Sequence, residues 1–82
     1  MSVSAPRRKV EDLEAQIAAH WEHQSELTLH RMLRDATMLF PKSDLEETQR
    51  LHIVNGMVWL RLKNPREAAA SFKAVLDIGE RG

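Results

Sequence analysis

From residue 10 onwards, apolar and polar positions alternate along the chain with the period of an α-helix. Apolar residues recur at spacings of three and four, which places them on one face of each predicted helix. In the first two helices this apolar face consists of Val10, Leu13, Ile17, Trp21, Leu29, Met32, Leu33, Ala36 and Phe40. No segment shows the strict alternation and turn dipeptides of paired strands. The pattern therefore predicts an all-α fold.

Start and stop signals define the second and third helices. Ser25 is a suitable N-cap for the second helix, and Pro41 stops that helix. The run Ser43-Asp44-Leu45-Glu46 matches a capping box, in which a serine oxygen and a glutamate carboxylate satisfy free backbone N–H groups. We expect this box to open a third helix that reaches about Leu62.

The fourth helix has the strongest start signal. Asn64 is a good N-cap, and Pro65 follows it at the first helical position. We expect this helix to end at Gly79. Short loops between four helices favour two antiparallel hairpins. The expected organisation is a flexible N-terminal arm at residues 1–9, followed by one helical domain at residues 10–82.

Composition limits the size and the class of the protein. The chain has 82 residues, no cysteine and a formal net charge of zero. A domain of this size buries only about 60% of the surface of its unfolded chain, so a partner could supply missing burial. The balanced charge argues against nucleic acid as the main partner, and no apolar run is long enough to span a membrane. We therefore expect a cytoplasmic protein.

Candidate catalytic and metal-binding residues are sparse. His20, Glu22 and His23 could bind zinc together with His30, but the sequence lacks the H-E-x-x-H pattern of zinc hydrolases. Three glycines are too few for a phosphate-binding loop, and no serine is flanked by nucleophile-elbow glycines. We predict a non-enzymatic protein without a metal or another cofactor.

The two predicted hairpins are related by an internal repeat. At an offset of 39 positions, residues of similar type or size pair as Leu33 with Phe72, Ala36 with Val75, and Ile17 with Gly56. The second unit, residues 50–79, resembles a tetratricopeptide repeat. The resemblance rests on Gly56, Trp59, Ala68, Phe72 and Val75, at the positions where that motif packs one helix against the next. The first unit matches less well.

The resemblance implies two hairpins stacked in a tetratricopeptide-like arrangement. Two repeats are fewer than the three usually needed for a self-sufficient stack, which again points to a partner. The third helix is apolar nearly all the way round, so every side of it must be covered. One side of this helix is expected to pack against its own partner helix and another side against the preceding hairpin. The side left uncovered carries Ile53, Met57 and Leu60, at spacings of four and three.

We therefore predict an apolar groove that accepts an amphipathic helix of a partner protein. The predicted groove residues are Ala18, Trp21, Ile53, Met57 and Leu60, with Arg50 and Arg61 as flanking charges. The alternative is that the apolar members simply fill a compact four-helix core. Leu76 and Ile78 form a second predicted contact edge, unless they belong to a core at the C-terminal end.

Residues 51–78 also resemble the small tetratricopeptide-like chaperones of bacterial type III secretion needles. The similar parts are the apolar helix 51–62, the turn at Asn64-Pro65 and the alanine-rich helix after it. The resemblance implies a cytoplasmic chaperone that holds a helix of a needle subunit, often with a small helical co-chaperone. The alternative function is a structural module whose third helix is buried in a homo-oligomer.

Overall fold

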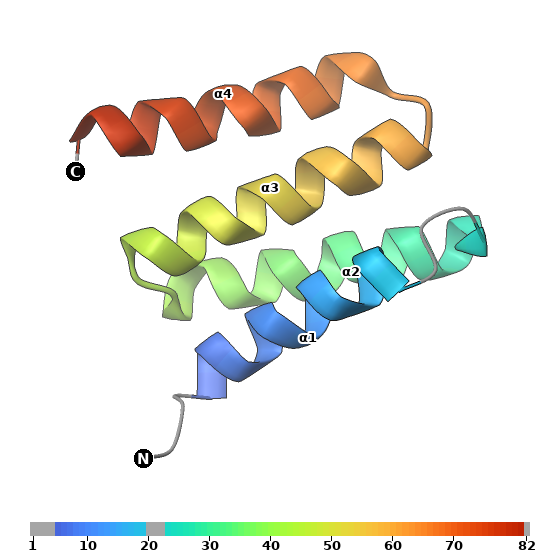
Figure 1. Cartoon of the computed structure of the whole chain (residues 1–82), viewed down its shortest axis with the longest axis horizontal. Helices are drawn as coiled ribbons and strands as arrows, with labels where there is room; N and C mark the ends of the chain where they lie inside the picture. Colours follow the sequence, from blue (N-terminus) through green and yellow to red (C-terminus); the bar gives the residue numbers. More distant parts are fainter. Residues whose placement is uncertain (1–4, 20–22, 82) are drawn as a thin grey trace.

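The computed structural model describes residues 5–19 and 23–81, and these residues form helices joined by short connections (Figure 1). The described elements are α1 (Ala5–Ala19), α2 (Glu26–Leu39), the 3₁₀ helix η2 (Phe40–Lys42), α3 (Leu45–Arg61) and α4 (Pro65–Arg81). None of the described residues lies in a strand. The predicted all-α fold of four helices is confirmed.

Helix α3 occupies the centre of the arrangement. It packs along α4 on one side, while α1 and α2 lie together on its opposite side (Figure 1). The turn between α3 and α4 is closed by Lys63, whose φ of 62° lies in the left-handed region, and by a hydrogen bond of 2.9 Å from the Asn64 N–H to the Trp59 carbonyl. The last two helices therefore form an antiparallel hairpin.

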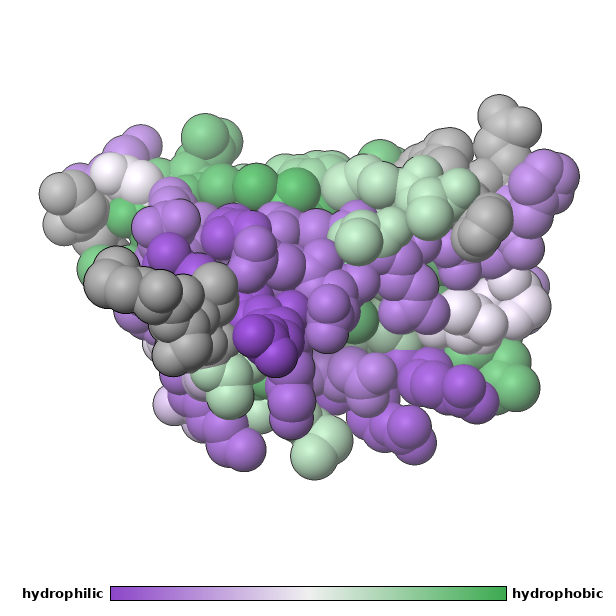
Figure 2. All heavy atoms as spheres, turned by 60° about the horizontal axis from the view of Figure 1, so that its bottom comes forward, coloured by the Kyte–Doolittle hydropathy of each residue, from purple (hydrophilic) through white to green (hydrophobic). Residues whose placement is uncertain are grey.

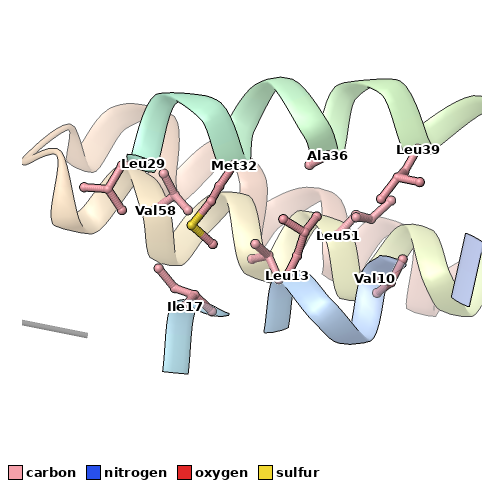
Figure 3. Close-up of a cluster of buried hydrophobic side chains, with 10 residues drawn as sticks. Val10, Leu13, Ile17, Leu29, Met32, Ala36, Leu39, Leu51 and Val58 are labelled. Atoms are coloured by element: carbon pink, nitrogen blue, oxygen red, sulfur yellow. The ribbon is translucent and has the colours of Figure 1, made fainter. Parts of the chain in front are cut away.

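The hydrophobic core is shared by the first three helices (Figure 3). Its buried residues are Val10, Leu13 and Ile17 of α1, Leu29, Met32, Ala36 and Leu39 of α2, and Leu51, Val54 and Val58 of α3. Partly buried Leu33, Phe40, Met57 and Leu62 pack against it. Within α4, Ala68 is the buried hydrophobic residue. The apolar stripes predicted for the first two helices thus face the core wherever the structure describes them.

The predicted starts of α2, α3 and α4 are confirmed, that of α3 with a shift of one residue. The Ser25 oxygen accepts the Thr28 N–H at 3.1 Å, and the Asn64 side-chain oxygen accepts the Glu67 N–H at 3.3 Å. The capping box of α3, however, uses Asp44 as the N-cap and Glu47 as its partner. Aspartate is as good an N-cap as serine, and a glutamate also follows Asp44 three residues later. A capping box that begins one residue later is therefore equally compatible with the sequence.

Two helix ends lie outside their expected positions. Helix α1 begins at Ala5, so residues 5–9 of the expected flexible arm are helical. Arg7 lies within 4 Å of three carboxylates at the start of α3. These ion pairs hold the first turn of α1 in place, although its sequence lacks the helical spacing of apolar residues. Helix α4 continues past Gly79 to Arg81. Gly79 packs near the Gln49 side chain instead of ending the helix.

The close approach of α3 and α4 depends on Gly56. A Cβ atom at this position would lie 2.5 Å from two atoms of the Phe72 ring and 2.9 Å from a third. Only glycine lets the ring rest directly on the α3 backbone. The repeat resemblance had singled out both residues as packing positions, and the structure brings them into contact.

Replacing Gly56 with alanine is expected to lower the free energy of unfolding by about 1–2 kcal/mol. Overpacking costs roughly 1–3 kcal/mol, and the better helix propensity of alanine returns about 0.5–1 kcal/mol. Gly79→Ala is the matched control, since its added Cβ would make an ordinary contact of 3.4 Å with the Gln49 amide nitrogen. Urea unfolding measures both variants. Equal or greater stability of Gly56→Ala than of Gly79→Ala would contradict the packing described here.

His52 stacks on Phe40, with ring centroids 4.7 Å apart and planes inclined at 42°. Burial lowers the pKa of His52 below its usual value, because the charged imidazolium is poorly solvated there. The unfolded chain therefore takes up this proton at a higher pH than the folded chain. Stability contributed by neutral His52 is present above the unfolded pKa of about 6.5 and is lost as the pH falls below it.

We expect the melting temperature of the protein to decrease when the pH is lowered from about 7.5 to about 5.5, partly because His52 becomes protonated in the unfolded chain. His52→Gln keeps a polar side chain that does not titrate in this range, so its melting temperature should fall less over the same interval. The measurement is thermal unfolding followed by circular dichroism at both pH values. An identical decrease in the two proteins would show that His52 contributes nothing to the pH dependence.

Candidate protein-binding surface

Helix α3 carries three apolar side chains on a side that the rest of the described chain leaves partly open. Ile53 is 40% exposed and Leu60 is 49% exposed, while Met57 between them is half-buried against the core. Spacings of four and three place the three residues on one stripe of the helix. We call this stripe, Ile53, Met57 and Leu60, the α3 strip. In this strip, Met57 contacts the core, whereas Ile53 and Leu60 are accessible to solvent.

Helix α1 borders the side of α3 that faces the core. Glu14 reaches Arg50 of α3 with both carboxylate oxygens, and Ala18 follows Glu14 by one helical turn. Ala18 is exposed and lies on the part of α1 that is turned towards α3. Trp21, the other predicted groove residue of this helix, lies outside the described residues.

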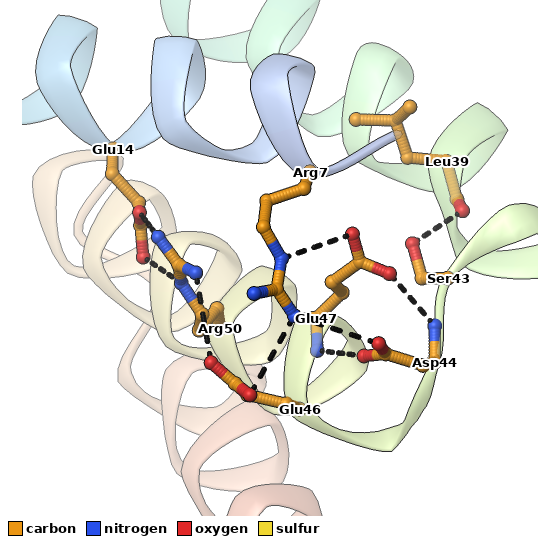
Figure 4. Close-up of polar contacts among 8 residues, drawn as sticks. All are labelled: Arg7, Glu14, Leu39, Ser43, Asp44, Glu46, Glu47 and Arg50. Atoms are coloured by element: carbon orange, nitrogen blue, oxygen red, sulfur yellow. Dashed lines mark hydrogen bonds and ion pairs between the residues drawn. The ribbon is translucent and has the colours of Figure 1, made fainter. Parts of the chain in front are cut away.

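Arg50 is engaged within the chain. Its Nε donates to Glu14 at 2.9 Å, its Nη2 donates to the second oxygen of Glu14, and its Nη1 lies 3.8 Å from Glu46 (Figure 4). The hydrogen bond with Glu14 raises the pKa of Arg50 above its ordinary value. This guanidinium was predicted to flank the groove as a charge, and in the structure it ties α1 to α3. Arg61 is half-buried at the end of α3.

A second group of charges joins the start of α1 to the start of α3. Arg7 lies 3.5 Å from Asp44, 3.6 Å from Glu46 and 3.8 Å from Glu47 (Figure 4). Glu47 is buried, and its other carboxylate oxygen accepts the Asp44 N–H of the capping box. Together with the Glu14–Arg50 pair, these contacts hold α1 beside α3 and set the position of the α3 strip relative to α1.

The predicted second contact edge, Leu76 and Ile78, is not a single edge. The two residues are two positions apart on α4, which puts them on nearly opposite sides of a helix with 3.6 residues per turn. Leu76 is 69% exposed, whereas Ile78 is half-buried. Leu76 lies one turn after Phe72, the residue that contacts Gly56, so it extends towards the α3 strip. The sequence pattern had singled out Phe72 as a packing residue, but the prediction grouped Leu76 with Ile78 instead of with the α3 strip.

A depression in the described part of the chain lies between α1 and α2. It has a volume of about 380 Å³ and is lined by Lys9, Asp12, Leu13, Gln16, Asp35, Met38, Leu39 and Lys42. The face shown in Figure 2, which turns the bottom of Figure 1 towards the viewer, is mainly hydrophilic, with hydrophobic residues collected along its upper edge. This depression opens on the α1–α2 side of the core and is not part of the α3 strip.

The described residues contain no group of three or more His, Cys, Asp or Glu side chains arranged to hold a metal ion. His20 and Glu22 of the zinc pattern weighed above fall outside the described residues. No helix found in residues 5–19 and 23–81 is long and apolar enough to cross a membrane. The chemistry that the described surface offers is apolar contact with charged residues nearby.

Comparisons with models of protein families, with curated proteins and with solved structures give no match to this chain. The resemblance to tetratricopeptide repeats and to secretion chaperones therefore stays a prediction.

The Glu14–Arg50 pair is expected to couple α1 to α3 by about 0.5–1 kcal/mol, because both side chains are partly exposed but meet in a two-bond geometry. A double-mutant cycle with Glu14→Gln and Arg50→Gln, measured by urea unfolding, gives this coupling energy. Arg34 and Asp35 provide the control cycle, since they are 4.0 Å apart and more exposed. The idea fails if the two cycles give the same coupling.

Proposed function

We propose that this protein is a non-enzymatic adaptor or chaperone that binds an amphipathic helix of a partner protein along the α3 strip. The observation that supports the proposal is the exposure of Ile53 and Leu60 at helical spacing on the central helix of the fold. Such a stripe matches the anchors that an amphipathic helix presents at positions i, i+3 or i+4, and i+7. Half-buried Met57 supplies a flexible, polarizable floor between them.

The position of α3 in the repeat supports a helix as the occupant. At the offset of 39 positions, Ile53 corresponds to Glu14 and Met57 corresponds to Ala18. Glu14 is the residue by which α1 holds the next helix, α3, through Arg50. The equivalent side of α3 carries Ile53 in place of that glutamate. A helix that lies against α3 as α3 lies against α1 would therefore meet an apolar surface instead of a charged one.

The energetic scale of such binding is moderate. Complete burial of a leucine or isoleucine side chain contributes about 1.5–3 kcal/mol, and Ile53 and Leu60 are already partly buried. Association must also offset an entropy cost of about 4–15 kcal/mol. The partner helix therefore has to cover further surface on α1 or α4 to bind with micromolar affinity. We expect a reversible complex that releases its client.

A finer proposal is that the client is a helix of a type III secretion needle subunit, held together with a small helical co-chaperone. Its support is the resemblance of residues 51–78 to the chaperones of those needles. The apolar character of the α3 strip suits a helix that would otherwise be buried in a polymer of needle subunits. A chaperone of that kind would prevent premature polymerisation by covering this helix.

Photo-crosslinking in the native cells tests the proposed function. A photoreactive phenylalanine analogue is placed at position 60 on the α3 strip or, as the control, at position 27 on α2, where Leu27 is 71% exposed. We expect position 60 to crosslink to an amphipathic helical segment of another protein, and position 27 not to do so. Crosslinks that are the same at both positions, or a captured segment without an apolar stripe, would exclude the proposal.

The captured segment, made as a peptide, then allows an affinity measurement. Leu60→Glu should weaken its binding about tenfold or more, because a charge replaces the most exposed apolar side chain of the α3 strip. Leu27→Glu, which changes an equally apolar exposed residue on another helix, should bind as the unchanged protein does. Circular dichroism and urea unfolding confirm that both variants are folded, as the 49% exposure of Leu60 leads us to expect. Unchanged affinity in Leu60→Glu would refute the role of the α3 strip.

A further inference from the structure

Helix α4 exposes a stripe in which a leucine lies between two opposite charges. Lys73, Leu76 and Glu80 follow one another at spacings of three and four, so they share one side of the helix. Leu76 is 69% exposed, and Lys73 and Glu80 are exposed as well. Neither charge forms an ion pair with another residue in the described part of the chain. We call Lys73, Leu76 and Glu80 the α4 stripe.

The α4 stripe is continuous with the apolar surface of α3. The contact between Gly56 and Phe72 fixes the antiparallel register of the two helices. Ile53 lies three residues before Gly56 and Leu76 lies four residues after Phe72, so Ile53 and Leu76 are level with each other at a rise of about 1.5 Å per residue. The apolar area therefore extends across both helices.

We propose that this surface pairs with a second copy of the chain, with the two α4 helices antiparallel and the two-fold axis passing beside Leu76, between positions 76 and 77. In such a pair, a residue shortly before the centre meets a residue shortly after it on the other helix. Lys73 then faces Glu80 of the second copy, and Glu80 faces Lys73 of the second copy. Leu76 packs against its own equivalent, as a two-fold interface requires.

The order of the charges favours a second copy over an unrelated helix as the occupant. A stripe with the same charge at both ends would repel itself in this antiparallel arrangement. The observed order, positive before Leu76 and negative after it, is self-complementary. Other exposed apolar residues lack such a stripe on one continuous α-helix; Met38 lies between Asp35 and Lys42, but Lys42 belongs to η2 and not to α2. Leu27, for example, lies beside His30, Arg31 and Arg34, a neighbourhood that would repel its own copy.

Pairing through the α4 stripe has a consequence for the α3 strip. A second copy centred on Leu76 would cover Ile53, which lies level with it, and would leave Leu60, seven residues away along α3, at the margin. Client binding and pairing would then compete. This competition rests on the proposed function, whereas the pairing itself does not. If client binding is not observed, pairing can still be tested by its own measurement, and if pairing is not observed, client binding can still be tested by its own.

The first test measures self-association of the purified chain by sedimentation equilibrium over a range of concentrations. We expect a reversible monomer–dimer equilibrium that Leu76→Glu abolishes. Leu27→Glu is the matched control, because Leu27 has a similar exposure, 71% against 69%, and this variant should dimerise as the unchanged chain does. A chain that stays monomeric at every concentration overturns the proposal. So does a dimer that Leu76→Glu leaves intact or that Leu27→Glu disrupts equally.

The second test determines the antiparallel register. Lys73→Glu and Glu80→Lys each place like charges opposite each other, so each should weaken the dimer roughly tenfold. An equimolar mixture of the two variants restores opposite charges at both contacts and should form a heterodimer about as strong as the original dimer. A mixture of Lys9→Glu and Asp12→Lys, which alters net charge identically on α1, controls for non-specific attraction. Failure of the first mixture to restore pairing, or equal gain in the control mixture, refutes the arrangement.

Discussion

Helix α3 has to be covered on two opposite sides at once, and the rest of the fold follows from the way each side is covered. The side with Leu51, Val54 and Val58 forms the core with α1 and α2. The opposite side has no room for a side chain at Gly56, because the Phe72 ring of α4 rests there. These two contacts fix the rotation of α3 about its own axis. The α3 strip lies between them, so its partial exposure is set by the packing on both sides.

Ion pairs between charged residues add to the small core in holding α1 against α3. Arg7 of α1 pairs with carboxylates at the start of α3, and Arg50 of α3 pairs with Glu14 of α1. These contacts are partly exposed, and individual pairs of this kind contribute little. Their main effect is geometric, since they choose which side of α1 meets α3. Although the whole chain has no net charge, two arginines and four carboxylates are therefore gathered where α1 meets α3.

Local signals and periodic patterns were sufficient to predict much of this fold. The stripe of Val10, Leu13 and Ile17 and the Asn64 cap depend on neighbouring residues, and both were predicted correctly. The start of α1 was not, because Arg7 is held by residues more than thirty positions away. The grouping of Leu76 with Ile78 disregarded the helical period, which puts residues two positions apart on nearly opposite sides of α4. Which side of α4 meets α3 is decided by the contact of Gly56 with Phe72, and no local pattern contains that register.

Buried residues are distributed unevenly between the first three helices and α4. The core cluster lies entirely within α1, α2 and α3, whereas α4 packs almost wholly on α3. Detachment of α4 would therefore leave that cluster intact while exposing the glycine side of α3. Openings of this kind have a lower free energy than global unfolding and are the first to occur in a native protein. The amide protons of α4 should then exchange with solvent ahead of those of α2, because α4 contributes no residue to the core cluster.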